Sequence, residues 1–144
     1  DDNSSNQTQY LTMSRTTTGD FTTAFVASTK LFFNPSTGTM NATDFNSLSD
    51  ATMKDNVETI GNAVETVEQL RGVTFTWKDN GETALGMIAQ EVEEVLPELV
   101  DENTETGTKS LKYGNVVGLL IEAVKDQQEQ IRELQKTVSD LSSK

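Results

Sequence analysis

The residues available for catalysis are limited, because the 144-residue chain contains neither cysteine nor histidine. This absence excludes disulfides, Ser-His and Cys-His dyads and the usual zinc sites. Lysine, aspartate and glutamate remain as possible bases. The stretch Ser49–Lys54 contains a serine, an aspartate and a lysine, and it stands where two segments of different composition meet.

Acidic side chains form two further groups that could carry chemistry. The first group resembles a set of paired catalytic carboxylates, but at this spacing a solvated acidic helix face is the simpler interpretation; it comprises Glu91, Glu93, Glu94 and Glu98. The second group could bind a cation, yet it lacks EF-hand spacing; it comprises Asp101, Glu102 and Glu105. We assign no metal and no cofactor.

Composition and charge narrow the class of protein. The net charge of −12 and pI near 4.3 argue against nucleic acid or an anionic membrane as a partner. No apolar run reaches the roughly 18 residues that span a bilayer, and the N-terminus lacks the features of a signal peptide. The length suits one modest domain and an accessory segment.

Residues 1–48 are rich in β-forming and hydroxyl residues. They contain 11 Thr and 6 Ser but only 6 charged residues. Two patches, 10–18 and 22–33, predict short strands, and Asn34–Gly38 predicts a turn. Their apolar residues are too few for a lone fold, so we expect this segment to complete its core against other copies or upstream chain. A disordered linker is the alternative.

Residues 49–144 differ, because 28 of these 96 residues are charged. A domain boundary therefore follows residue 48. Apolar residues recur every three or four positions and predict an amphipathic helix over about 50–70: Met53, Val57, Ile60, Val64, Val67 and Leu70. Gly72 ends this helix.

Shorter elements follow. Alternation over Val73–Lys78 predicts a half-buried strand with Trp77 in the core, and Asp79–Gly81 predicts a turn. Residues 86–96 predict a second helix that Pro97 stops. Residues 101–109 read as a loop before a brief strand at 110–113.

The last segment has the clearest periodicity. Its apolar residues, with one glutamine, are spaced alternately by three and four, which predicts a coiled coil over about 115–142: Val117, Leu120, Val124, Gln127, Ile131, Leu134, Val138 and Leu141. Ala123 and Ile121 widen this stripe, as higher oligomers need. The heptads alone do not decide between a coiled coil of two helices and one of three.

Five blocks together resemble one known family. They are Ser49-Asp50 followed by Lys54, then Leu70–Trp77, GMIAQEVEEVLPELV at 86–100, Leu111–Tyr113 and Leu120–Lys125. In this order they resemble the intramolecular chaperone domain of phage tail spikes and tail fibres, the self-cleaving peptidase S74 family known from endosialidase tailspikes. The resemblance covers residues 49–144.

The resemblance implies a homotrimer that folds the upstream β-structured fibre and then cuts itself off before a serine. Carried onto this chain, it implies Ser49 as nucleophile, Lys54 as general base and Leu48-Ser49 as the scissile bond. The commonest family pattern has Arg and Leu before the lysine, where this chain has Thr52 and Met53. The implied enzyme is a self-cleaving serine peptidase acting once, in cis.

The proposed dyad constrains local structure. Five residues on a helix rotate by about 140°, so Ser49 must lie outside the helix if it meets Lys54. Asp50 is a favoured N-cap and would make Lys54 the fourth helical residue. The helix dipole and partial burial would then favour the neutral amine. An oxyanion stabiliser is also needed, and Gln90 or backbone amides are candidates.

We therefore expect an α+β fold, mainly α: a β-rich fibre end at 1–48 and a helical chaperone domain with small strands and a long coiled-coil helix at 49–144, as a homotrimer. The expected function is a C-terminal intramolecular chaperone that releases itself at Leu48-Ser49. The alternative is a non-cleaving relative retained as a trimerisation cap. A related module of eukaryotic membrane-tethered transcription factors is disfavoured by the lack of a basic segment.

Expected partners are the chain itself and the upstream fibre chain, with a host receptor bound through the mature fibre. The fibre belongs to the virion, and the chaperone acts in the host cytoplasm during assembly.

Overall fold

The computed structural model describes residues 9, 12–13, 25–26 and 30–143, and its parts divide into two units, Asp1–Asp55 and Asn56–Lys144. The predicted strands at 10–18 and 22–33 fall largely outside the described residues. The first unit contains strands β1 (Thr12–Met13) and β2 (Phe25–Val26), which pair antiparallel, and the hairpin of β3 (Leu31–Asn34) and β4 (Thr39–Ala42).

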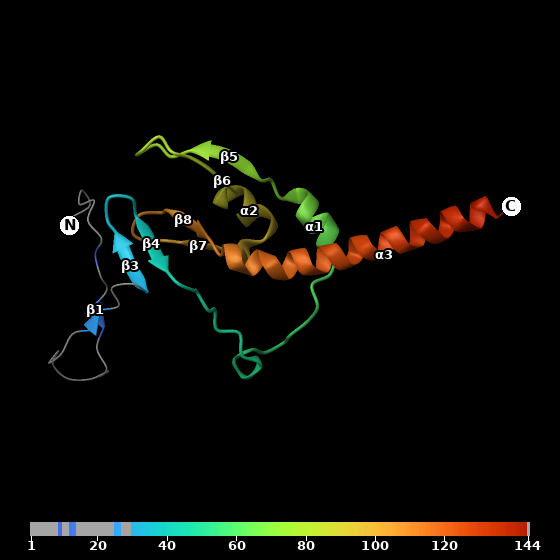
Figure 1. The fold of residues 1–144 in the computed structure, drawn as a ribbon, viewed down its shortest axis with the longest axis horizontal. Coiled ribbons are helices and arrows are strands. Elements are labelled where there is room, and N and C mark those ends of the chain that lie inside the picture. The colour runs from blue at the N-terminus through green and yellow to red at the C-terminus, as the bar shows by residue number, and fades with distance from the viewer. Residues whose placement is uncertain (1–8, 10–11, 14–24, 27–29, 144) are drawn as a thin grey trace. The chain divides into compact units, whose positions relative to one another are not determined.

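The β3–β4 hairpin confirms the turn that Asn34–Gly38 predicts. Asn34 Oδ1 accepts a hydrogen bond from the backbone N–H of Ser36 at 3.0 Å, and Gly38 takes a positive φ of 67°. Asn side chains favour such turns, and glycine adopts this backbone conformation without a steric penalty. The predicted arrangement of short strands joined by a turn is therefore confirmed for this hairpin, which Figure 1 shows.

The helix predicted over 50–70 is wrong in extent. The structure has one 3₁₀ turn, η1 (Ala51–Met53), and then a short helix, α1 (Ala63–Gln69), with non-helical chain between them. Asn56 and Asn62 both have a φ of 51°, which breaks a right-handed helix. Met53 and Val57 are 69% and 75% exposed, so burial does not offset the cost of helix formation in the single chain.

The second unit contains two antiparallel hairpins and a short helix. Strands β5 (Val73–Thr76) and β6 (Thr83–Gly86) form the first hairpin, and β7 (Val100–Glu102) and β8 (Lys109–Leu111) form the second. Helix α2 (Ala89–Val95) lies between them in sequence and ends before the 3₁₀ turn η2 (Pro97–Leu99), as Pro97 predicts. The loop predicted over 101–109 is too long, because Asp101 and Glu102 pair with Ser110 and Lys109.

Trp77 does not lie in a core, contrary to prediction. It is 54% exposed, and its ring meets Phe75 edge-on with centroids 5.1 Å apart. Phe75 and Trp77 do lie on the same side of the hairpin, as the alternation predicts. A sheet of only two strands leaves much of that side uncovered.

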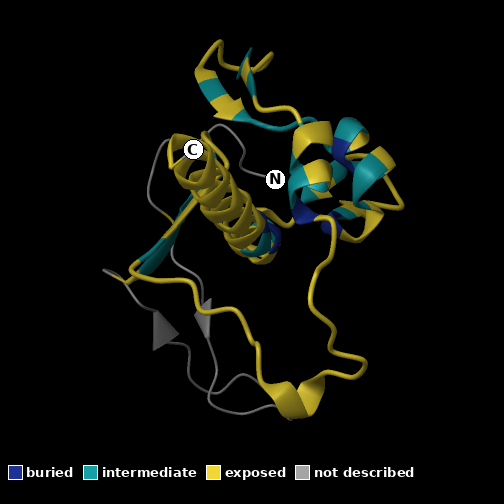
Figure 2. Cartoon of the chain, turned by 90° about the vertical axis from the view of Figure 1, so that its right-hand side faces the viewer, coloured by how far each residue is buried: buried dark blue, intermediate teal, exposed yellow. Residues whose placement is uncertain are grey.

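Helix α3 (Val116–Ser142) follows the 3₁₀ turn η3 (Tyr113–Asn115) and confirms the long helix expected over about 115–142. Its first turns pack against α1, where Ala63, Leu119 and Ala123 are buried at 0%, 4% and 5% exposure. Partly buried side chains surround this core: Val64, Val67, Leu70 and Leu96. In Figure 2 the blue residues of α3 lie in its first turns, and the rest of the helix is exposed.

Candidate functional site

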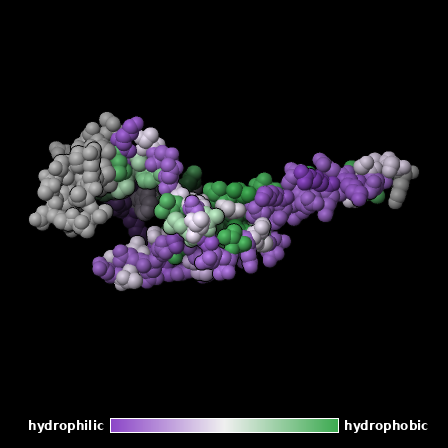
Figure 3. Space-filling view, turned by 90° about the horizontal axis from the view of Figure 1, so that it is seen from below, coloured by the Kyte–Doolittle hydropathy of each residue, from purple (hydrophilic) through white to green (hydrophobic). Residues whose placement is uncertain are grey.

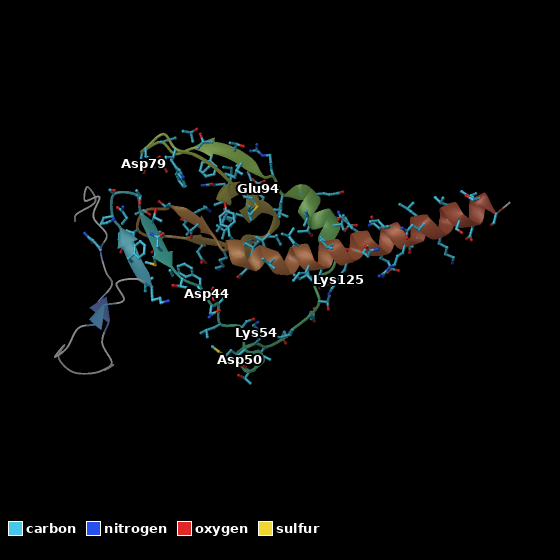
Figure 4. The ribbon with its side chains drawn as sticks, in the orientation of Figure 1. Asp44, Asp50, Lys54, Asp79, Glu94 and Lys125 are labelled. Carbon is cyan, nitrogen blue, oxygen red and sulfur yellow. The ribbon has the colours of Figure 1, made fainter. Side chains whose placement is uncertain are left out.

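Ser49 and Lys54 are joined by a direct hydrogen bond. The Lys54 Nζ atom donates to the Ser49 Oγ atom at 2.6 Å, across five positions of sequence. Figure 4 labels Lys54 and Asp50 on the turn that brings this about. A serine hydroxyl in direct contact with a lysine amine is the arrangement that a Ser-Lys nucleophile requires.

Asp50 organises the turn between the two residues. Its Oδ1 atom accepts hydrogen bonds from the backbone N–H of Thr52 at 2.8 Å and from the Thr52 hydroxyl at 2.7 Å. These two bonds from Thr52 hold the pKa of the Asp50 carboxyl below its ordinary value of 3.8. Asp50 is thus the N-cap of η1, as the sequence predicts, and Ser49 lies outside the helical turn.

Lys54 does not occupy the fourth position of a helix, contrary to prediction. The single turn closes with bonds from Met53 N to Asp50 O and from Lys54 N to Ala51 O, both at 3.2 Å. Lys54 is the C-cap, with an extended φ of −131° and ψ of 136°. One 3₁₀ turn has little dipole, so the dipole argument for a neutral amine does not apply, and the residue is exposed rather than partly buried.

The predicted scissile bond lies in exposed chain. Leu48 is 86% exposed, and every residue from Ser49 to Lys54 is exposed as well. The peptide between Leu48 and Ser49 is therefore open to solvent and to other chains. A hydrolytic reaction needs water at this position.

Gln90 lies in the second unit, in the first turn of α2. It lines a cleft of about 580 Å³ between the β5–β6 hairpin, α2 and β8, together with aromatic and aliphatic side chains that include Phe75, Trp77 and Tyr113. The role of Gln90 as an oxyanion donor stays a prediction.

The acidic residues of α2 take part in ion pairs. Arg71 pairs with Glu91 through two hydrogen bonds, of which the one from Nε measures 3.0 Å. The hydrogen bond from Arg71 holds the pKa of Glu91 below its ordinary value of 4.5. Lys109 pairs with Glu93 at 2.5 Å and Glu102 at 3.2 Å, and the hydrogen bonds that Lys109 donates to these carboxylates raise the pKa of Lys109. These pairs tie α2 to its neighbours.

A contact that sequence reasoning missed connects Tyr113 to the start of the α2 segment. The backbone N–H of Met87 donates to Tyr113 Oη at 2.9 Å. A Cβ atom on Gly86 would lie 2.6 Å from the same oxygen and 3.3 Å from Phe75, so only glycine leaves room for the hydroxyl. Gly86 and Tyr113 both lie in the blocks that carry the family resemblance, and this shared membership was the one sign in the sequence that the two residues could be related.

The predicted coiled-coil residues face away from the core. The seven apolar ones are between 45% and 67% exposed, and Gln127 is exposed too. Ala123, predicted to widen the seam, is instead buried against α1, while Ile121 is 50% exposed. Figure 3 shows hydrophobic atoms gathered around the N-terminal part of α3 and a mainly hydrophilic C-terminal half.

The described residues also lack two further features, a metal site and a membrane-spanning helix. No cluster of three or more acidic side chains there has the geometry of a metal site. None of the helices in the same residues combines the length and apolar character that crossing a membrane requires.

Comparison with known proteins places the chain. Residues 49–101 match the family model Peptidase S74, described as chaperone of endosialidase. Long tail fiber protein Gp37 of Enterobacteria phage K3 and of phage T2 are each 36% identical over 104 residues, which is 67% of this chain and 8% of either relative. Gp37 of Salmonella phage S16 is 31% identical over 115 residues, which is 72% of this chain and 15% of that protein.

The chain thus spans between 8% and 15% of the length of these relatives. The family model begins at Ser49, the residue that opens the hydrogen-bonded turn. Residues 49–101 therefore belong to the chaperone-of-endosialidase family, Peptidase S74.

Proposed function

We propose that residues 49–144 are the intramolecular chaperone of a phage tail fibre, which promotes trimerisation and folding of the upstream β-structured chain and then cuts the Leu48-Ser49 bond. The hydrogen bond between Lys54 Nζ and Ser49 Oγ is the observation that carries the proposal of cleavage. The family match and the tail fibre relatives support the chaperone role. The mature fibre would join the virion and meet a host receptor.

The chemistry balances with Ser49, Lys54 and one water molecule. A neutral Lys54 amine accepts the Ser49 hydroxyl proton, so the contact of 2.6 Å is used with the donor and acceptor exchanged. The Ser49 Oγ atom attacks the Leu48 carbonyl carbon, the bond from that carbon to the Ser49 nitrogen breaks, and the nitrogen takes up the proton. Water then hydrolyses the ester and frees the Leu48 carboxylate.

The exposure of the dyad supports control by assembly. General-base catalysis by lysine needs the neutral amine, which removal from water favours. In the single chain Lys54 is exposed. We therefore expect the dyad to become active when neighbouring chain covers it in the folded trimer. Cleavage would then report that folding is complete, and loss of the chaperone would lock the fibre kinetically.

The surface of α3 supports self-association. Leu119 and Ala123 bind α1 in the same chain, whereas the heptad residues use a different face and stay exposed. An apolar stripe of this length is costly to leave in water. A second and third copy of the same helix would bury it, with Gln127 fixing the register.

Substitution of the dyad tests the proposed cleavage. Freshly expressed wild-type chain should give fragments that end at Leu48 and begin at Ser49, and both Ser49→Ala and Lys54→Ala should abolish them. Ser47→Ala, a nearby serine outside the dyad, should cut normally. Hydroxylamine added during the reaction should capture Leu48 as its hydroxamate, because it attacks an ester faster than an amide.

The alternative is a non-cleaving chaperone that stays attached as a trimerisation cap. This chain departs from the commonest family pattern of Arg and Leu at Thr52 and Met53, and at Thr52 it lacks the charge of that pattern. A wild-type chain that forms trimers but stays intact on long incubation would establish this alternative, and Ser49→Ala would then behave like the wild type.

A further inference from the structure

Thr52, which lies between Ser49 and Lys54, has two specific contacts with Asp50. Both its backbone N–H and its hydroxyl donate to the same oxygen of Asp50, at 2.8 and 2.7 Å. The charged residues of the segment 43–57 are Asp44, Asp50, Lys54 and Asp55. None of these acidic side chains forms a salt bridge with Lys54 in this described segment, and the Lys54 amine contacts Ser49 instead.

Asp50 and Lys54 cap the two ends of one short 3₁₀ turn, and opposite charges so close along the chain attract each other, so the Asp50 carboxylate could compete for the amine. A carboxylate in contact with the amine would stabilise the protonated form, which cannot act as a base. Two donors from Thr52 occupy the Asp50 oxygen that caps η1. The threonine hydroxyl thereby keeps the carboxylate in its capping position and leaves the amine to the serine.

We propose that Thr52 is a positioning residue for cleavage, whose hydroxyl holds the Asp50 carboxylate on the cap and away from Lys54, so that the amine stays with Ser49. This inference rests on the proposed self-cleavage, because holding the Asp50 carboxylate matters only if Lys54 must act as a base toward Ser49. The proposal gives a role to Thr52, which differs from the Arg of the commonest family pattern.

The test is a double-mutant cycle on the full chain. Thr52→Val removes the hydroxyl but keeps the shape and the backbone donor, so the carboxylate is less firmly held. We expect cleavage at neutral pH to slow about threefold, and the rise of the rate with pH to move up by about half a pH unit, as a weak exposed ion pair to Lys54 would cause. Thr52→Ser keeps the hydroxyl and should restore the wild-type rate.

Asp50→Asn separates the proposed role from simple capping. Asparagine still caps the turn and accepts from Thr52, but it carries no charge to attract the amine. In the Asp50→Asn background, Thr52→Val should therefore have no further effect on the pH profile. An equal penalty in both backgrounds would show that the hydroxyl only stabilises the turn, and that result overturns the proposal.

A measurement that does not need cleavage keeps the two proposals apart. NMR of ¹³C-labelled lysine follows titration of the Lys54 amine in uncut chain, and its midpoint should move to higher pH in Thr52→Val but not in Asp50→Asn with Thr52→Val. If the wild type cuts and this midpoint does not move, the role of Thr52 is wrong and the dyad stands. If the midpoint moves in a chain that never cuts, the dyad is wrong and the role of Thr52 in holding the carboxylate stands.

Discussion

At the scale of single residues, short polar contacts decide how the chain is arranged where apolar burial is small. The Lys54–Ser49 bond, the Asp50–Thr52 bonds and the Tyr113–Met87 bond each join exposed groups. Exposed hydrogen bonds and ion pairs contribute little stability individually. Their value in this protein is geometric, because each fixes which atoms face each other.

Gly86 is predicted to be intolerant of a side chain. Gly86→Ala would place a Cβ atom 2.6 Å from Tyr113 Oη, and relief of such a clash typically costs about 1 to 3 kcal/mol. Tyr113→Phe removes the oxygen, so the alanine should cost less in that background. Urea unfolding of the four chains of this cycle measures the difference. Equal penalties in both backgrounds would contradict the proposed clash.

The Arg71–Glu91 pair is predicted to make stability depend on pH. Because the pair lowers the pKa of Glu91 in the folded chain, its contribution is full above the ordinary value of 4.5 and is lost as the pH falls through the lowered folded-state value. Glu91→Gln should therefore be less stable than the wild type at neutral pH and equal to it in strong acid.

Thermal unfolding between pH 2 and 7 at low salt checks this expectation. Glu94→Gln is the control on the same helix, since Glu94 forms no salt bridge to any described residue. A Glu91→Gln deficit that stays constant down to the lowest pH would show that the charge of Glu91 is not its cause.

At the scale of elements, the long helix α3 has two apolar faces. One face, through Leu119 and Ala123, closes the small core on α1, and the heptad residues form the other. The flanking e and g positions between Ala123 and Gln135 are uncharged, being Ala123, Gln128, Gln130 and Gln135. No charge along this stretch of the flanks opposes the approach of identical helices.

A matched pair of leucine substitutions should separate these faces. Leu119→Ala removes a side chain that is 4% exposed and should lower the free energy of unfolding by about 3 kcal/mol. Leu134→Ala, at 64% exposure beyond the reach of α1, should leave the packing of α1 intact and weaken self-association. Hydrogen exchange of α1 amides and sedimentation equilibrium measure the two effects. Exchange that is equally fast in both variants would contradict this division.

The elements differ in how well the sequence predicts them. The eight heptad positions predict α3, and Asn34–Gly38 predicts the β3–β4 turn, because each signal is local. The periodicity of Met53, Val57 and Ile60 is just as clear, yet that stretch is not helical in the single chain. Amphipathic periodicity forms a helix only where a surface covers its apolar face, and Asn56 and Asn62 interrupt the backbone.

The contact between Ser49 and Lys54 could be predicted from the sequence, but its geometry could not. The family pattern leads to Ser49, Asp50 and Lys54, and capping chemistry places Asp50 correctly. The position of Lys54 after a single turn, and the two bonds from Thr52, depend on local hydrogen bonding that spacing alone does not determine. The prediction that Trp77 lies in the core was wrong for a related reason. Alternation shows which side of a strand a residue occupies, but not whether another element covers that side.

At the scale of the whole molecule, the single chain leaves much of its apolar surface uncovered. Leu48, Met53 and Val57, which lie within ten residues of the chain, are more than two-thirds exposed. Each copy also carries a net charge of −12, so association must overcome mutual repulsion. The exposed apolar side chains, unlike the charge, agree with the proposal that the domain is complete only as an assembly and that cleavage follows assembly.

The most direct test of this account is the intact mass of purified wild-type chain under denaturing conditions, followed over time at a concentration where it is trimeric. We predict that one mass is replaced by two, for residues 1–48 and 49–144, with the sum increased by one water. A trimeric chain whose mass stays that of residues 1–144 would contradict the proposed cleavage.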